Sequence, residues 1–291
     1  MLSKKRLNMK NKIIAATVAM MLILICIIPG ILSFSHKKDA EYEIVCFGDS
    51  VMACLYGDGS VPYYIEELTG RTTLNAAFGG LPMSRHSEYE KIGDINPLFT
   101  MAELSEALLR SDFSLQATAT KTYDEVWPSE WRGIPEELNR LDYEKVRFVI
   151  IEHGVNDYQL GIPVDDMANP HNTYTFGGAL RTSIENVRKA IPNATIVLCT
   201  PTYMHFLNYD KDCYEADYGG GTLPEYVEKE KEIAAEYGVI CVDNFNGSGI
   251  NKDNYLEYLY DGLHSHQGGN ILIAENIVRN VEGMVKDEVT P

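Results

Sequence analysis

The sequence predicts an α/β fold in which a parallel sheet carries helices on both faces. From about residue 42 onward, short apolar runs alternate with longer segments in which apolar residues recur at helical spacing. Several of the short runs are apolar throughout, which is typical of strands that are buried on both sides. Strands and helices that alternate in this way indicate one α/β domain.

Five runs are predicted to form the strands of the sheet. The first strand, 43–47, leads directly into Gly48-Asp49-Ser50. The other four strands are expected at 71–75, 146–152, 195–199 and 239–242. Helices are expected at 50–67, 102–109, 180–190 and 224–237, and over the apolar repeat from Gly268 to Val285. The connection at 81–145 shows only the one helical pattern, followed by an aromatic, proline-broken stretch.

An uncharged segment, 13–34, separates a basic tail, 1–12, from the rest of the chain. As a helix this segment would extend about 33 Å, enough to cross a bilayer. The basic tail places the amino terminus in the cytoplasm and the bulk of the chain outside it. We therefore expect a signal anchor, a linker at 35–41 and an extracytoplasmic domain at 42–291. The alternative is a cleaved signal peptide and a secreted protein, because Ser33-Phe34-Ser35 loosely fits a cleavage site.

The charge of the chain is strongly uneven. Residues 1–38 contain seven basic and no acidic residues, so the formal net charge of −17 leaves −24 for the remainder. A domain this acidic repels phosphates, which argues against nucleic acid as a partner. Of the six cysteines, only Cys54 and Cys213 lie where a disulfide is conceivable, and we predict that they do not pair.

Polar residues follow the predicted strands at several places. Ser50 follows the first strand, Gly79-Gly80 the second, and Gly154-Val155-Asn156-Asp157 the third. The carboxyl ends of parallel strands lie at one edge of a sheet, so these loops are expected to converge. Asp261 and His264 precede the last helix, and their spacing allows a carboxylate to contact an imidazole. Serine, histidine and aspartate supply the nucleophile, base and orienting group of acyl transfer.

Four blocks of the chain resemble those of the SGNH, or GDSL, hydrolase family. They are Gly48-Asp49-Ser50, Asn75 with Gly80, Gly154-Val155-Asn156-Asp157 and Asp261-Gly262-Leu263-His264. The blocks occur in the family's order and extend over nearly the whole predicted domain. The resemblance implies a flavodoxin-like three-layer α/β/α sandwich with a five-stranded parallel sheet, and hydrolysis of esters through an acyl-enzyme.

The resemblance also implies a role for each matching residue. Ser50 would be the nucleophile, His264 the general base and Asp261 the residue that orients it. The backbone N–H groups of Ser50 and Gly80 and the side chain of Asn156 would form the oxyanion hole. No metal or other cofactor is implied, and the histidines show no metal-ligand spacing.

Two details of the blocks leave alternatives open. The family usually has proline after the catalytic histidine, whereas this chain has Ser265-His266. His266 is therefore a second candidate for the base, although the spacing pairs Asp261 with His264. In the second block Gly79 is the alternative to Gly80 as the oxyanion donor.

The expected function is that of a serine esterase outside the cytoplasm, which removes small acyl groups, acetyl in particular, from carbohydrate. A glycan O-acyltransferase would use the same residues, a lipase or lysophospholipase is a variant, and a binding module without activity is the remaining alternative. The aromatic residues Trp127, Trp131, Tyr203 and His205 either line a sugar-binding groove or pack the loops onto the core. The predicted partners are an ester substrate and the membrane; the sequence does not predict an oligomeric state.

Overall fold

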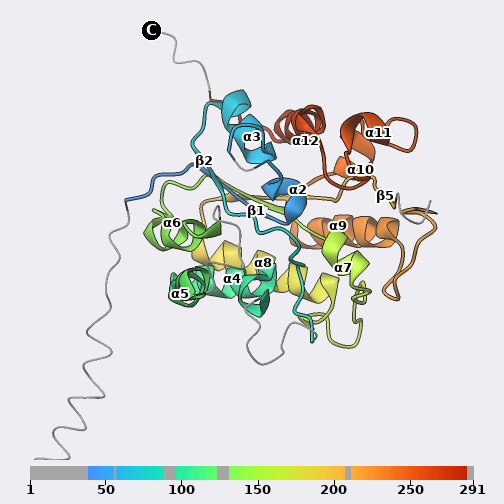
Figure 1. Ribbon diagram of the computed structural model, residues 1–291. Helices are drawn as coiled ribbons and strands as arrows, with labels where there is room; N and C mark the ends of the chain where they lie inside the picture. The colour runs from blue at the N-terminus through green and yellow to red at the C-terminus, as the bar shows by residue number, and fades with distance from the viewer. Residues whose placement is uncertain (1–38, 56, 88–95, 123–130, 207–210, 287–291) are drawn as a thin grey trace, which may run out of the picture. The chain divides into compact units, whose positions relative to one another are not determined.

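The computed structural model describes residues 39–55, 57–87, 96–122, 131–206 and 211–286, whose course Figure 1 shows. They belong to a unit that begins at Asp39. The predicted basic tail and membrane-spanning segment lie outside the described residues. Within the described ranges, no helix is both long and apolar enough to cross a bilayer.

A five-stranded sheet runs through the middle of this unit in the strand order β2-β1-β3-β4-β7. Its strands are β1 (Ile44–Gly48), β2 (Thr73–Asn75), β3 (Phe148–Glu152), β4 (Thr195–Cys199) and β7 (Ile240–Val242). Every neighbouring pair of strands is parallel. The predicted five-stranded parallel sheet is confirmed, and its strand order is that of flavodoxin-like folds.

The central strand β1 shows why an apolar run forms this sheet. Successive side chains of a strand point to opposite faces. Val45 and Phe47 belong to the apolar core on one face, while Ile44 and Cys46 belong to the core on the other. All four side chains are fully buried. Because both faces are covered, every position of the strand has to be apolar.

Helices cover both faces of the sheet (Figure 1). The core of one face includes residues of α4 (Met101–Arg110), α8 (Phe176–Ala190) and α9 (Leu223–Tyr237). The core of the other face includes residues of α3 (Val61–Thr69) and α12 (Gln267–Asn280). The result is a sandwich of three layers, with the sheet in the middle.

The helix predicted at 50–67 is in fact two helices, α2 (Ser50–Ala53) and α3. Between them Gly57 and Gly59 have φ angles of 81° and 135°. A right-handed helix cannot continue through such a backbone. Ser60 then starts α3, because its hydroxyl accepts a hydrogen bond from the backbone N–H of Tyr63. This is a capping arrangement that favours a new helix at this point.

Shorter elements, which the sequence pattern did not indicate, connect the main ones. They are η1 (Asn96–Phe99), α5 (Ser114–Thr122), α6 (Ile134–Arg140), α7 (Val155–Gln159), β5 (His205–Phe206), β6 (Lys211–Asp212), α10 (Asn244–Gly247) and α11 (Tyr255–Tyr258). In addition, the final helix ends at Asn280, so that Val281 and Val285 of the predicted repeat lie beyond it.

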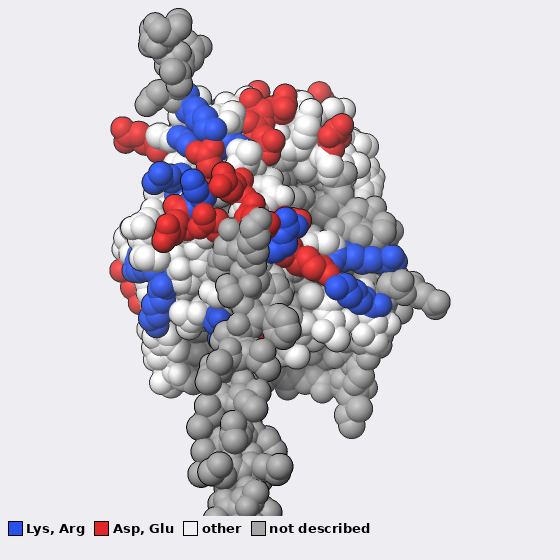
Figure 2. Space-filling model, turned by 90° about the vertical axis from the view of Figure 1, so that its left-hand side faces the viewer, with Lys and Arg blue, Asp and Glu red and all other residues white. Residues whose placement is uncertain are grey.

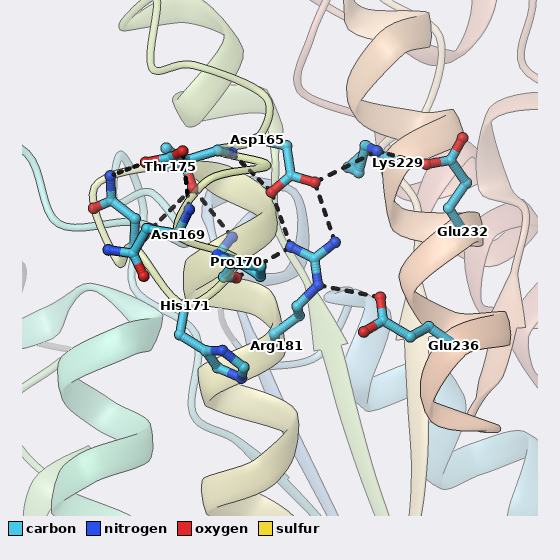
Figure 3. Close-up of polar contacts among 12 residues, drawn as sticks. Asp165, Asn169, Pro170, His171, Thr175, Arg181, Lys229, Glu232 and Glu236 are labelled. Atoms are coloured by element: carbon cyan, nitrogen blue, oxygen red, sulfur yellow. Dashed lines mark hydrogen bonds and ion pairs between the residues drawn. The ribbon is translucent and has the colours of Figure 1, made fainter.

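A buried ion pair joins the loop after α7 to helices α8 and α9 (Figure 3). Arg181 of α8 donates hydrogen bonds to both carboxylate oxygens of Asp165, at 2.8 and 3.1 Å, and both side chains are 8% exposed. The Arg181 Nε also donates to Glu236 of α9 at 3.1 Å. Burial alone would raise the pKa of Asp165, but the hydrogen bonds from Arg181 outweigh this and hold it below its usual value.

Replacing Arg181 by methionine is expected to lower the free energy of unfolding by about 3 kcal/mol, because it leaves the buried Asp165 carboxylate without its main partner. Denaturation by urea at neutral pH measures this loss. The matched control is Lys189→Met on the same helix, whose 60% exposed side chain pairs with Glu185 at 3.5 Å. That change is expected to cost less than about 1 kcal/mol. Equal losses in the two variants would contradict the prediction.

The charges at the amino ends of the strands are closely mixed. Glu43, immediately before β1, pairs with Arg71 at 2.7 Å and with Lys286 at 2.6 Å, and Arg140 pairs with Asp39 at 2.8 Å. Figure 2 shows one face of the molecule, on which basic side chains lie directly among acidic ones. Such a face lacks the extended positive potential that attracts a phosphate backbone. The absence of a nucleic-acid partner stays a prediction.

Candidate active site

Ser50 lies at the sharp turn between β1 and α2. The turn requires glycine at position 48, since a Cβ there would lie 2.6 Å from Met52 Cγ and 3.1 Å from the Glu152 carbonyl oxygen. Asp49 precedes the helix and caps it, because its Oδ1 accepts a hydrogen bond from Val51 N at 2.9 Å. Ser50 is thereby held at the carboxyl edge of the sheet, at the first position of a helix.

His264 reaches Ser50 from the loop between α11 and α12. Its Nε2 lies 2.9 Å from Ser50 Oγ, and its Nδ1 lies 2.6 Å from Asp261 Oδ2. The three side chains that the sequence singled out as nucleophile, base and orienting group are therefore in direct contact. A serine hydroxyl next to an imidazole can transfer its proton as it attacks an electrophile.

The Asp261 carboxylate is held on both of its oxygens. Its Oδ1 accepts hydrogen bonds from Leu263 N at 3.0 Å and from His264 N at 2.7 Å, while Oδ2 faces the imidazole. Partial burial raises the pKa of Asp261, but these hydrogen bonds outweigh it and hold the pKa below its usual value. Asp261 is consequently an ionised acceptor that fixes the orientation of the imidazole.

Ser265 and His266 replace the expected proline without disturbing this arrangement. Ser265 is buried, and its hydroxyl donates to Asn270 Oδ1. His266 stands at the position before α12, where its side chain makes no capping hydrogen bond, and its ring lies 5.6 Å from that of Tyr260. The Tyr260 ring also stacks on the His264 imidazole, with 5.7 Å between the centroids and 20° between the planes. Of the two histidines, His264 is the one hydrogen-bonded to the serine.

The Asn156 side chain, predicted as an oxyanion donor, is bound to Asp49. Its Nδ2 donates to Asp49 Oδ2 at 3.0 Å and reaches the Leu81 carbonyl oxygen at 3.4 Å. Burial raises the pKa of Asp49 to about 7, although the hydrogen bonds from Val51 and Asn156 favour its ionised form. Asp49 thus connects the turn of Ser50 to α7, which follows β3. The sequence pattern did not indicate this contact.

The loop after β2 lies against the serine. A Cβ added to Gly79 would be 3.4 Å from Ser50 Cβ and 3.4 Å from Trp131 Cζ2. Gly80, the predicted donor, is exposed, has a φ angle of 77° and faces open space where a side chain would stand. Of the two glycines of this block, Gly79 is thus the one next to Ser50, and Trp131 also packs against it.

Asp157 braces the same loop. Its carboxylate accepts hydrogen bonds from Met83 N at 2.8 Å and Ser84 N at 3.0 Å, and from the Ser84 hydroxyl. The loop after β2 is thereby joined to α7. Asn75 has a similar local role, since its Oδ1 accepts a hydrogen bond from Ala77 N at 3.1 Å.

The remaining predicted residues lie away from these contacts or outside the described ranges. Tyr203 is buried and His205 stacks on Tyr255, while Trp127 falls in a part that the structure does not describe. Cys54 and Cys213 are free thiols. In the described part of the chain, no group of three or more acidic, histidine or cysteine side chains is arranged to hold a metal ion.

Comparison with known proteins decides the family. The model of the GDSL-like lipase/acylhydrolase family matches residues 46–270. The chain belongs to this family. It is therefore a hydrolase of the type that acts on esters. No curated protein matches the chain.

Solved structures share the fold of this GDSL-like hydrolase at low sequence identity. One covers 86% of this chain and all of its own, with a TM-score of 0.58 and 20% identity. A possible lipase from Chitinophaga pinensis covers 82% of this chain and 97% of its own, with a TM-score of 0.54 and 16% identity. A protein from Lactobacillus plantarum covers 83% and 96%, with a TM-score of 0.53 and 16% identity. At these identities the likeness shows the fold alone.

The GDSL-like hydrolase also buries a carboxyl group close to its serine turn. Glu152 ends β3 beside Gly48 and is 1% exposed. Among the described residues neither of its oxygens has a hydrogen-bond partner. Burial raises the pKa of Glu152 well above its usual value, and the charges of Asp49 and Glu230 add to the rise. Asp49 accepts two hydrogen bonds and ionises first, so Glu152 holds its proton to a higher pH than an exposed glutamate does.

The burial of Glu152 predicts a stability that depends on pH. The folded state holds the Glu152 proton to a higher pH than the unfolded chain, which loses it above its ordinary pKa of 4.5. Stability contributed by this group is thus complete at low pH and falls as the pH rises. Glu152→Gln is expected to gain about 1–3 kcal/mol over the natural protein at about pH 8 and little at about pH 5, as measured by urea denaturation.

The control for this experiment is Glu257→Gln, which changes an exposed carboxylate of α11. Its stability should follow that of the natural protein at both pH values. A Glu152→Gln protein whose stability falls with pH as steeply as that of the natural protein would show that Glu152 is ionised in the folded state.

Proposed function

We propose that the chain is an extracytoplasmic serine esterase that hydrolyses small acyl esters, acetyl esters above all, on carbohydrate. One observation carries the chemistry: Ser50 Oγ lies 2.9 Å from His264 Nε2, and His264 Nδ1 lies 2.6 Å from Asp261 Oδ2. A nucleophile, a base and an orienting carboxylate in this geometry suit acyl transfer through a covalent intermediate. Membership of an ester hydrolase family supports the same chemistry.

The reaction has two half-reactions that use the same base. As Ser50 Oγ attacks the ester carbonyl carbon, His264 Nε2 accepts the hydroxyl proton and Asp261 stabilises the imidazolium that forms. The tetrahedral intermediate then collapses, and the alcohol leaves with the proton from His264. Water attacks the acyl-enzyme, gives its proton to His264, and releases the carboxylic acid and the free serine.

The oxyanion of each tetrahedral intermediate needs donors on the far side of the carbonyl from the base. In this proposal they are the backbone N–H groups of Ser50 and Gly80 and the side chain of Asn156. The Asn156 amide has a short bond to Asp49 and a longer one, 3.4 Å, to the Leu81 carbonyl. The oxyanion would replace the longer bond, while Asp49 keeps the amide in place.

The proposal of a small acyl group rests on Trp131. A Cβ on Gly79 would lie 3.4 Å from both Trp131 Cζ2 and Ser50 Cβ, so the indole stands close to the serine, and its ring packs edge-on against Phe78 with centroids 5.6 Å apart. A rigid aromatic wall at this distance from the nucleophile leaves little room for a long acyl chain. Short acyl groups such as acetyl fit this side of the serine best.

Solvent access favours hydrolysis over transfer to a sugar hydroxyl. The side chains of His264 and Asp261 are 25% and 42% exposed. Water can therefore approach the base directly and attack the acyl-enzyme.

The location outside the cytoplasm is proposed from the uncharged segment 13–34 and the basic tail before it. Protease added to intact cells should then degrade the domain.

The test of this function is acetate release from p-nitrophenyl acetate and from acetylated xylan, with Ser50→Ala as the control. Release from both substrates that depends on Ser50 supports a carbohydrate esterase. Release that requires an added sugar acceptor, with the acetyl group transferred to it, would replace hydrolysis by acyl transfer. A folded protein that releases no acetate from either substrate would refute the esterase.

A further inference from the structure

A hollow lies near the carboxyl ends of β4 and β7. It has a volume of about 250 Å³ and is lined by Tyr203, Tyr214, Phe245, Asn246 and residues 249–253. We call it the Tyr214 hollow. Tyr203 and Phe245 are almost completely buried and form its base, whereas the Tyr214 side chain is 53% exposed. The Tyr214 ring is held edge-on against Phe245, with 5.5 Å between the centroids.

The Tyr214 hollow opens at the same edge of the sheet as Ser50. Tyr203 follows the carboxyl end of β4, and Phe245 follows that of β7, whereas Ser50 follows β1. In the strand order, β3 and β4 separate β1 from β7. Three strand spacings correspond to about 14 Å. A ligand in the hollow would therefore have to be extended to reach the serine as well.

Direct contacts connect the base of the hollow to the loop of His264. The Tyr203 hydroxyl lies 3.5 Å from His205 Nδ1, and the His205 ring stacks on Tyr255 with centroids 4.7 Å apart. The His205 backbone N–H donates to the Gly262 carbonyl oxygen at 2.9 Å. The hollow is thus fixed relative to the base of the proposed reaction.

The chemistry of the hollow suits a neutral, polyhydroxylated ligand. The half-exposed Tyr214 ring offers an apolar face with a hydroxyl at its edge, which is how aromatic side chains receive amphipathic rings. Asn251 and Asp253 are exposed at its rim and supply hydrogen-bonding groups. The one lysine, Lys252, is paired with the buried Asp212 at 2.8 Å, so the rim does not favour an anion. The polar rim also disfavours an acyl chain.

We propose that the Tyr214 hollow is a glycan subsite, which binds a sugar unit of the same chain whose acyl ester lies at Ser50. This inference rests on the proposed carbohydrate esterase and specifies its substrate as an oligosaccharide or polysaccharide. A small ester reaches only the serine, whereas an extended glycan also occupies the hollow. The hollow therefore contributes to the binding of long substrates and leaves the hydrolysis of small esters unchanged.

The test compares Tyr214→Ala with Tyr214→Phe, which keeps the ring and serves as the matched variant. The substrates are p-nitrophenyl acetate and acetylated oligosaccharides of xylan and of glucomannan. Tyr214→Ala is expected to lower kcat/KM about tenfold on the oligosaccharides, mainly through KM, as loss of one stacking contact implies. Both variants should match the natural protein on p-nitrophenyl acetate, which also shows that they are folded.

The other results count either against the subsite or against the esterase. Equal kcat/KM of Tyr214→Ala and the natural protein on every oligosaccharide would overturn it, as would activity confined to p-nitrophenyl acetate. Equal losses of kcat/KM in the alanine and phenylalanine variants would show that the Tyr214 ring does not contribute to binding. Calorimetric titration of Ser50→Ala with the same oligosaccharides measures the subsite without turnover. Ring-dependent binding there, with no acetate released by the natural protein, would refute the esterase and retain the subsite.

Discussion

Replacing Ser50 by alanine is expected to lower kcat for p-nitrophenyl acetate by roughly 10⁶-fold, and His264→Ala is expected to do the same. The reason is that the two side chains act as one unit. Without His264 Nε2, which lies 2.9 Å away, the Ser50 proton has no acceptor, and without Ser50 the base has no nucleophile to activate. The double variant should consequently be no slower than either single variant. The activity that remains comes from binding and from the oxyanion donors.

His266→Ala is the matched control for this measurement. It removes an exposed imidazole two positions along the chain, which lies 5.6 Å from the Tyr260 ring and makes no capping hydrogen bond to α12. Its kcat should stay within a few-fold of that of the natural protein, since His264 is the histidine hydrogen-bonded to Ser50 Oγ. Loss of activity in His266→Ala and its retention in His264→Ala would assign the base to the second histidine.

The layers of the fold were predictable because a strand that is buried on both faces requires a continuous run of apolar residues, which can be recognised in the sequence. The strands 148–152 and 195–199 have to pack against helices on two sides, so they are almost entirely apolar. The break between α2 and α3 was predictable in principle from Gly57 and Gly59. The break was missed because the apolar residues before and after these glycines recur at helical spacing, as they would in one continuous helix. Connections such as α5 and α6 depend on contacts with distant parts of the chain, which a local pattern does not contain.

The candidate site was predictable to the extent that its residues follow strand ends. Ser50 and Asn156 each follow a strand of a parallel sheet, so topology alone brings them to one edge. The atoms that these two side chains contact could not be predicted in the same way. That the Asn156 amide is bound to Asp49, and that Glu152 is buried without a partner, results from the register of β1 against β3. Such contacts between strands are not encoded in the spacing of residues along the chain.

The second large effect is expected from Asp261→Asn, which should lower kcat by about 10⁴-fold at neutral pH. The backbone N–H groups of Leu263 and His264 both donate to Oδ1. An asparagine at this position has to keep its carbonyl oxygen there, so its amide nitrogen takes the place of Oδ2. That nitrogen would donate a hydrogen bond to His264 Nδ1. The proton of the neutral imidazole would then be on Nε2, where it blocks acceptance of the Ser50 proton.

If the tautomer of His264 is what matters, Asp261→Asn and Asp261→Ala should differ in kcat. Asp261→Ala also removes the carboxylate, but it imposes no tautomer, and water can reach Nδ1 because the Asp261 side chain is 42% exposed. Asp261→Ala should therefore be the faster of the two variants, although alanine is the less similar residue. Steady-state kcat on p-nitrophenyl acetate decides the order. If Asp261→Asn is the faster variant, the amide has rotated and the two backbone donors do not control its orientation. The carboxylate would then act through its charge and not through the tautomer it selects.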